Sequence, residues 1–275
     1  MPMHRSLEKV LQYDRWVIIA LLVTVTISSW LFVIKGAGTG MSAAMMTGID
    51  LATGGGMRMP AEMPSWTFAY AIIIFFMWWI MMIAMMLPSV ASIILLYSTL
   101  TRRLNHTQNP SVLAGTFLGG YLAAWAFFSL LATLLQSVLE LRGFVSPMMM
   151  SLTSQIISAG VLIAAGLYQF TPVKESCLQH CQNPMKFLTE KRRPGYRGAF
   201  LMGVEHGAFC LGCCWFLMAL LFVGGIMNLY WIIGLTLYVL LEKLIPTRNF
   251  INIGKIAGGL LILSGVGIII NGFVN

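Results

Sequence analysis

Seven long apolar segments dominate this chain of 275 residues. They cover about residues 15–34, 66–97, 112–139, 146–170, 199–223, 228–245 and 254–272. A helix of about 20 residues spans the hydrocarbon core of a membrane. With 58% hydrophobic and only 9% charged residues, the chain lacks the composition of a soluble domain, in which roughly 25% of residues are charged. The sequence therefore predicts an all-α fold, a polytopic transmembrane bundle of about seven helices that forms one integral membrane domain over residues 1–275.

The basic side chains sort to one side of this predicted bundle. If the N-terminus is cytoplasmic, all of the 17 lysines and arginines except Lys35, Arg58 and Arg142 lie inside. The positive-inside rule then predicts an odd number of crossings, with the N-terminus inside and the C-terminus outside. The net charge of +8 therefore indicates contact with lipid headgroups, and we expect no nucleic acid as a partner. The first apolar stretch is too long for a cleavable signal peptide.

The fifth apolar segment carries an unusual group of polar side chains. At about 100° per residue from His206, the side chains of Cys210, Cys213 and Cys214 lie at about 40°, −20° and 80°, so all four share one face of a helix. Glu205 lies to one side of that face. Thiolates and imidazoles are ligands for soft metal ions, and polar groups within a membrane usually mark a functional site. The pattern predicts a metal site near the middle of the membrane, with Cu(I) preferred and zinc possible.

Two further segments offer ligands at a similar depth. The second apolar segment carries Met82 and Met85, whose thioethers favour Cu(I), and the sixth carries Glu242. Either Glu205 or Glu242 is expected to accept a hydrogen bond from the free ring nitrogen of a metal-bound His206. Methionine and cysteine also fill apolar cores without any chemical role, so each of these residues has a purely structural explanation as well.

Two connections are long enough to carry more than a turn. The outside loop, about residues 36–65, is rich in methionine and would suit a surface that collects Cu(I). The inside loop, about residues 171–197, contains Cys177, His180 and Cys181 at spacings that share one face if the segment is helical. These three residues predict a second soft-metal site inside, or a pair of redox-active thiols.

Glycines at a spacing of four residues predict close helix packing. Gly115 and Gly119 lie in the third apolar segment, and Gly254 and Gly258 lie in the seventh. This small-xxx-small spacing lets two helix backbones approach closely. We expect the contact within one protomer, in a homo-oligomer, or with a second membrane protein.

These motifs resemble a bacterial family of poorly characterised, polytopic integral membrane proteins that are predicted to bind metal. The resemblance covers roughly residues 66–272. It rests on Ala84-Met-Met-Leu-Pro88, on Lys174, Cys177, Cys181 and Pro184, on Gly207, on Cys210-Leu-Gly-Cys-Cys-Trp215, and on Met218, Gly225, Asn228 and Glu242-Lys243. It implies a metal without naming the metal or the reaction, and it implies a location in the bacterial inner (cytoplasmic) membrane.

Three functions are compatible with these observations. The first is copper handling, in which Cu(I) is stored, transferred or translocated, with a cytoplasmic metal donor as a possible partner. The second is enzymatic, either a membrane copper oxidoreductase or a thiol oxidoreductase that pairs Cys213 and Cys214 with Cys177 and Cys181. The third is a structural subunit of a membrane complex, in which the metal fixes the bundle. No phosphate-binding loop, haem motif or dinucleotide fingerprint is present, so ATP-driven pumping by this chain is not expected.

Overall fold

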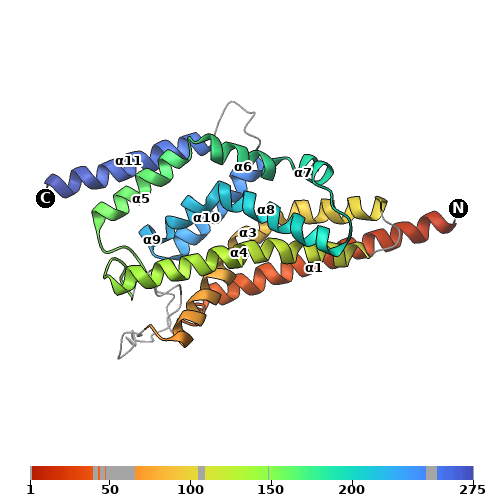
Figure 1. The fold of residues 1–275 in the computed structure, drawn as a ribbon, viewed down its shortest axis with the longest axis horizontal. Coiled ribbons are helices and arrows are strands. Elements are labelled where there is room, and N and C mark those ends of the chain that lie inside the picture. The colour runs from red at the N-terminus through yellow and green to blue at the C-terminus, as the bar shows by residue number, and fades with distance from the viewer. Residues whose placement is uncertain are drawn as a thin grey trace.

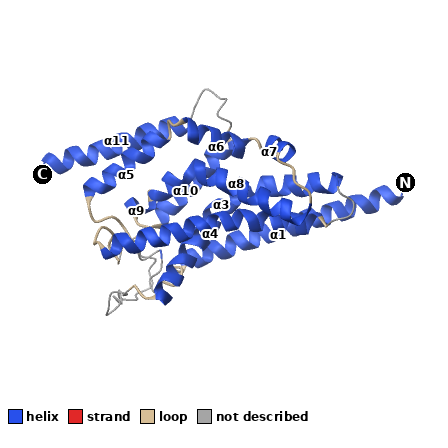
Figure 2. Cartoon of the chain, in the orientation of Figure 1, coloured by secondary structure: helices blue, strands red, loops and turns tan. Residues whose placement is uncertain are grey.

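The computed structural model describes residues 2–39, 43, 47, 66–104, 109–147, 149–245 and 253–274. The predicted all-α fold is confirmed over these residues, in which the helices form an elongated bundle (Figures 1 and 2). The helices are α1 (Pro2–Ile34), α3 (Phe68–Leu104), α4 (Pro110–Leu141), α5 (Gln155–Tyr168), α6 (Pro172–Gln182), α7 (Pro184–Glu190), α8 (Gly195–Ala219), α9 (Leu221–Gly224), α10 (Leu229–Leu244) and α11 (Ile253–Val274). Most of the predicted outside loop lies outside the described residues.

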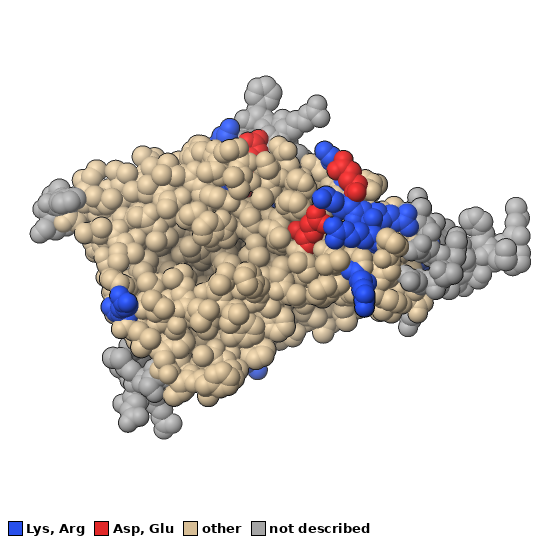
Figure 3. Space-filling view, in the orientation of Figure 1, with Lys and Arg blue, Asp and Glu red and all other residues tan. Residues whose placement is uncertain are grey.

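Five of these helices are long and apolar enough to cross a membrane, so the chain is a membrane protein. They are Arg15–Ile34, Phe68–Arg102, Pro110–Leu141, Gly195–Gly224 and Ile253–Gly272. A sixth crossing is possible if α5 and α6, which meet at a bend of 64°, form one broken span. The remaining predicted span is α10, a shorter helix of 16 residues. The two termini lie at opposite ends of the bundle (Figure 1), and lysines and arginines gather toward the N-terminal end (Figure 3).

The fourth predicted segment is shorter than the expected range of 146–170. Residues 142–147 and 149–154 leave the helical path, since Gly143 has a φ of +73° and Val145 pairs with Leu152 in an isolated β-bridge. The helix α5 begins only at Gln155, where the Ser154 side chain accepts a hydrogen bond from the Ile157 amide. The link between the third and fourth segments is therefore longer than the ranges 112–139 and 146–170 predicted.

The predicted inside loop is largely helical. Thr171 caps α6 by accepting a hydrogen bond from the Lys174 amide, and Pro172 occupies the first turn, where a missing amide hydrogen is tolerated. Asn183 separates α6 from α7, and Pro184 starts the second short helix in the same way. As a result, Cys177, His180 and Cys181 lie on a helix and not on an extended loop.

Glycines bring two pairs of helices into close contact, but most of these glycines are not the ones that the sequence predicted. On α4 and α8, a Cβ on Gly120 would overlap the backbone of Phe200, and one on Gly203 would overlap the backbone of Phe117. On α5 and α11, a Cβ on Gly258 would lie 2.9 Å from the carbonyl oxygen of Gly166, so this predicted glycine does mediate packing.

Gly115 and Gly119 have no atoms within 4 Å of the Cβ position. The expectation that these two glycines mediate packing is wrong for contacts within the described chain, because they lie on a face of α4 that other helices do not cover. A role between protomers stays a prediction.

Candidate metal centre

All five cysteines of the chain are free and gather where α6 packs against α8. The helix α8 supplies Cys210, Cys213 and Cys214, each 1% exposed. The helix α6 supplies Cys181, which lies beside Cys210 and Cys213, and Cys177, which lies near Cys213. The thiols of the α8 stripe and of the inside group, predicted as parts of two separate sites, therefore form one cluster, whereas His180 of the inside group stacks on Phe209.

Gly212 allows this approach of the two helices. A Cβ at this position would lie only 2.6 Å from the Cys177 sulfur. The carbonyl oxygen of Gly212 also accepts a hydrogen bond of 2.5 Å from the Tyr168 hydroxyl. The glycine within Cys210-Leu-Gly-Cys-Cys is thus the contact point for α6, and the motif contained this signal although sequence reasoning assigned the glycine no role.

The thiols of α8 hydrogen bond to their own helix. Cys213 and Cys214 donate to the carbonyl oxygen of Cys210, with sulfur–oxygen distances of 3.1 and 2.6 Å, and their sulfur atoms are 3.9 Å apart. Within the described ranges, no group of three or more His, Cys, Asp or Glu side chains is already arranged to hold a metal ion. Metal binding would therefore require these thiols to rotate away from the carbonyl.

Cys210 has two further partners, from α4 and α10. Its sulfur lies 3.2 Å from the Tyr121 hydroxyl and 2.9 Å from the Lys243 ammonium, which also donates to the Ser89 hydroxyl at 3.0 Å. Lys243 is half-buried, and its ammonium points into the bundle and not toward a membrane surface. Sequence reasoning missed Lys243 as a site residue, because a lysine near a helix end usually extends toward the headgroups.

His206 is 4% exposed and surrounded by aromatic rings. Its ring lies 6.1 Å from Phe117, 6.0 Å from Tyr121 and 5.3 Å from Phe187, measured between ring centres. Among the described residues, its Nδ1 has no hydrogen-bond partner. An unsatisfied buried polar atom is costly, so this nitrogen is available to a ligand, and the His206 side chain lies near Cys210.

The two carboxylates expected beside His206 are engaged elsewhere. Glu205 pairs with Lys191 at 3.0 Å and with Arg193 at 3.5 Å. Glu242 is 4% exposed and pairs with Lys174 at 2.5 Å. The predicted hydrogen bond from His206 to Glu205 or Glu242 is therefore absent from the described structure, in which both carboxylates form ion pairs with lysine or arginine instead.

The methionines on α3 are part of the core. Met82 is 0% exposed and Met85 is 1% exposed. The helix α3 reaches the cysteine cluster one turn further on, where Ser89 accepts the hydrogen bond from Lys243. Burial agrees with either a structural or a ligand role, so copper binding by Met82 or Met85 stays a prediction.

The fold and the site define a class: a helical membrane protein with a buried cluster of free thiols. Residues 75–268 match the family model of PpoB2, which is described as a copper chaperone, and the chain belongs to this family. The match supports the copper association expected from the thiols. Comparison with curated proteins and with solved structures gave no match.

Proposed function

We infer that this protein handles copper by holding Cu(I) at the cysteine cluster between α6 and α8 before passing it on. The main ligands are the thiolates of Cys210 and Cys213, with Cys181, Cys214 and His206 completing the set during loading or release. The observation that supports this inference most strongly is the convergence of all five cysteines from two separate helices, with the half-buried Cys177 and Cys181 of α6 next to the buried thiols of α8. Soft thiolates favour Cu(I) over Zn(II) and the harder divalent ions.

The charges around the cluster fit a Cu(I)–thiolate complex. Two thiolates and one Cu(I) carry a net charge of −1, and the ammonium of Lys243 lies 2.9 Å from the Cys210 sulfur. An isolated charge is very unfavourable in an apolar interior, whereas a neutral assembly of thiolates, metal and ammonium is not. Lys243 thus supplies the charge that lets an anionic complex exist inside the bundle.

The sulfur and nitrogen atoms of the cluster could bind copper without a change in the helices. Rotation about the Cα–Cβ bonds of Cys213 and Cys214 exchanges a hydrogen bond to the Cys210 carbonyl for a metal–sulfur bond, and the backbone of α8 stays in place. The free Nδ1 of His206 needs no partner to be displaced. Copper is the cargo in this proposal, so a ligand set that can rearrange favours its transfer.

The proposed location is the bacterial inner membrane, with the N-terminus in the cytoplasm and a cytoplasmic copper donor as partner. The bias of basic residues supports this orientation, because basic side chains favour the cytoplasmic side of a membrane. Five exposed basic residues lie on α7, on α8 or between them: Lys186, Lys191, Arg192, Arg193 and Arg197. Labelling of single introduced cysteines with a membrane-impermeant reagent in intact cells and inverted vesicles tests the orientation.

Copper content tests the proposed function. Protein purified without chelator after growth with copper should contain near-stoichiometric copper, and the Cys210→Ser, Cys213→Ser double variant should lose it. Ala199→Ser is the matched control, because it places a hydroxyl at a buried position of the same helix, α8. A copper-free wild-type protein, or unchanged copper in the double variant, would reject the proposal.

A further inference from the structure

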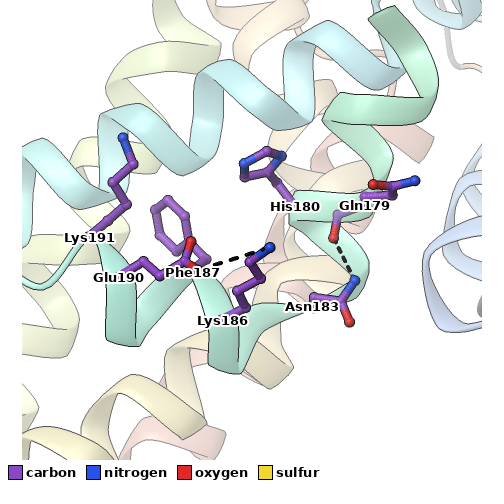
Figure 4. A pocket seen from close by; sticks show the side chains of 7 residues that line it. All are labelled: Gln179, His180, Asn183, Lys186, Phe187, Glu190 and Lys191. Atoms are coloured by element: carbon purple, nitrogen blue, oxygen red, sulfur yellow. Dashed lines mark hydrogen bonds and ion pairs between the residues drawn. The ribbon is translucent and has the colours of Figure 1, made fainter. Parts of the chain in front are cut away.

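A cavity of about 110 Å³ lies between α6 and α7, beside α8 (Figure 4). A water molecule needs on the order of 10–15 Å³ by such a measure, so the cavity has room for several waters or for an ion with small ligands. Its rim includes the exposed side chains of Gln179, Lys186 and Lys191. The two lysines have carboxylate partners, Glu190 at 4.0 Å and Glu205 at 3.0 Å.

His180 presents a soft donor atom in this cavity. Its Nδ1 lies 2.8 Å from the carbonyl oxygen of Ser176, and a carbonyl can only accept, so Nδ1 carries the hydrogen. In the neutral ring the other nitrogen, Nε2, then has a free lone pair, which is the form that binds metals. The ring stacks on Phe209 of α8, with 4.1 Å between ring centres and an angle of 5°. The imidazole is therefore held in one orientation.

Phe187 separates the cavity from the buried cluster. Its ring lines the cavity, as Figure 4 shows, yet the residue is only 2% exposed and its ring lies 5.3 Å from that of His206. The Nδ1 of this neighbouring His206 ring has no partner among the described residues. On the other side, His180 is followed directly in α6 by Cys181, which lies beside Cys210.

We propose that this cavity is the port through which Cu(I) reaches and leaves the cysteine cluster, with His180 as its first ligand and Phe187 as the gate. The proposal rests on the proposed function and adds the route by which copper reaches and leaves the cluster. Copper bound by His180 passes to Cys181 and His206 when the Phe187 ring turns aside, and ligand exchange at each step keeps the ion coordinated. The cavity suits an ion with small ligands, because it is too small for a segment of a donor protein.

The rate of copper loss tests the port separately from copper binding. Copper-loaded full-length protein in detergent is mixed with an excess of bathocuproine disulfonate, a water-soluble Cu(I) chelator, and the coloured complex is followed over time. His180→Ala should slow copper loss about tenfold. This is the lower end of the roughly 10–100-fold change in metal affinity or activity that follows the loss of a group supporting a metal site. His180→Met should restore the rate, because it returns a soft ligand without the ring. Phe187→Ala and the milder Phe187→Leu should both speed copper loss several-fold.

Two matched controls identify effects of packing alone. Gln179→Ala changes a neighbouring residue that lines the cavity but offers no soft ligand, and it should leave the rate unchanged. Phe222→Ala removes another buried ring, in α9, at the opposite end of α8 from α7 (Figure 1).

Wild-type rates in His180→Ala and the Phe187 variants, with copper content intact, would overturn the port alone. Equal acceleration by Phe222→Ala, or no rescue by His180→Met, would also overturn it. A wild-type protein without copper would reject the proposed function and the port with it.

Discussion

The two lysines that lie between α6, α8 and α10 have opposite kinds of partner. Lys174, 2% exposed, pairs with the buried carboxylate of Glu242 at 2.5 Å and also donates to Gln169. Lys243, the residue next to Glu242, instead donates to the Cys210 thiol at 2.9 Å and to the Ser89 hydroxyl at 3.0 Å. The first lysine is neutralised by a group that is always available, and the second is neutralised only when a thiol loses its proton.

This difference distinguishes the Lys174–Glu242 ion pair, which is structural, from the Lys243–Cys210 contact, which suits a metal site. The Lys174–Glu242 pair, with the Tyr238 hydroxyl at 2.9 Å from the same carboxylate, joins α6 to α10 and leaves no charge to be balanced. A thiolate of Cys210 would balance the Lys243 ammonium, and the proposed Cu(I) bis-thiolate would keep that balance. Breaking each partnership in turn should therefore give different results.

The largest effect is expected from Lys174. Lys174→Met leaves the Glu242 carboxylate buried without its partner, and such a loss costs about 3–5 kcal/mol of stability. Thermal unfolding of the detergent-solubilised protein measures the loss. The control is the double variant Lys174→Met, Glu242→Gln, which removes both charges and should regain much of the stability. A single variant as stable as the wild type would show that the pair is not structural.

A smaller effect is expected at the contact between α6 and α8. In Gly212→Ala, the new Cβ would meet the Cys177 sulfur at 2.6 Å, so the helices must separate, at a cost of about 1–3 kcal/mol. Copper affinity should fall as Cys181 moves away from Cys210. Gly160→Ala is the matched control, since a Cβ there has no neighbour within 4 Å. Equal thermal stability and equal copper affinity in the two variants would contradict the packing described for α6.

Lys243→Met should change copper affinity without a large change in stability. Replacing this ammonium with an apolar side chain of similar length leaves no buried carboxylate unpaired, unlike Lys174→Met. Copper affinity, measured by chelator competition, should fall about tenfold, because the Cu(I)–thiolate complex loses its balancing charge. Lys243→Arg keeps the charge and should retain most of the affinity. Wild-type affinity in Lys243→Met would remove this lysine from the site.

The smallest effect is expected at Glu205. Its partners Lys191 and Arg193 are 47% and 45% exposed, and solvent-exposed ion pairs contribute only about 0–1 kcal/mol. Glu205→Gln should therefore keep both the unfolding temperature and the copper content close to wild type. A marked loss of copper would restore Glu205 to the metal site, as the sequence had suggested.

Much of the fold could be predicted because its determinants are local. Apolar length predicted the helices, and the helical repeat predicted one shared face for His206, Cys210, Cys213 and Cys214, all of which are buried. The start of α5 at Gln155 was missed because three methionines and Leu152 made the preceding residues look like part of the apolar span, although Ser154 caps the helix.

The composition of the cluster could not be predicted, because it depends on how different helices are rotated against each other. Nothing in the spacing on α8 reveals that Cys181 of α6 lies beside Cys210, or that Lys243 turns inward from α10. The same limit explains Glu242, whose partner is Lys174 and not His206. Residue types predicted a soft-metal site, and helix packing decided which of those residues gather there.

X-ray absorption at the copper edge of the purified, copper-loaded protein tests the central claim most directly. The claim predicts the edge of Cu(I) and a first coordination shell dominated by sulfur, with the sulfur contribution reduced in Cys210→Ser. A spectrum of copper bound only by nitrogen and oxygen, or one unchanged by Cys210→Ser, would contradict the assignment of the cysteine cluster as the copper site.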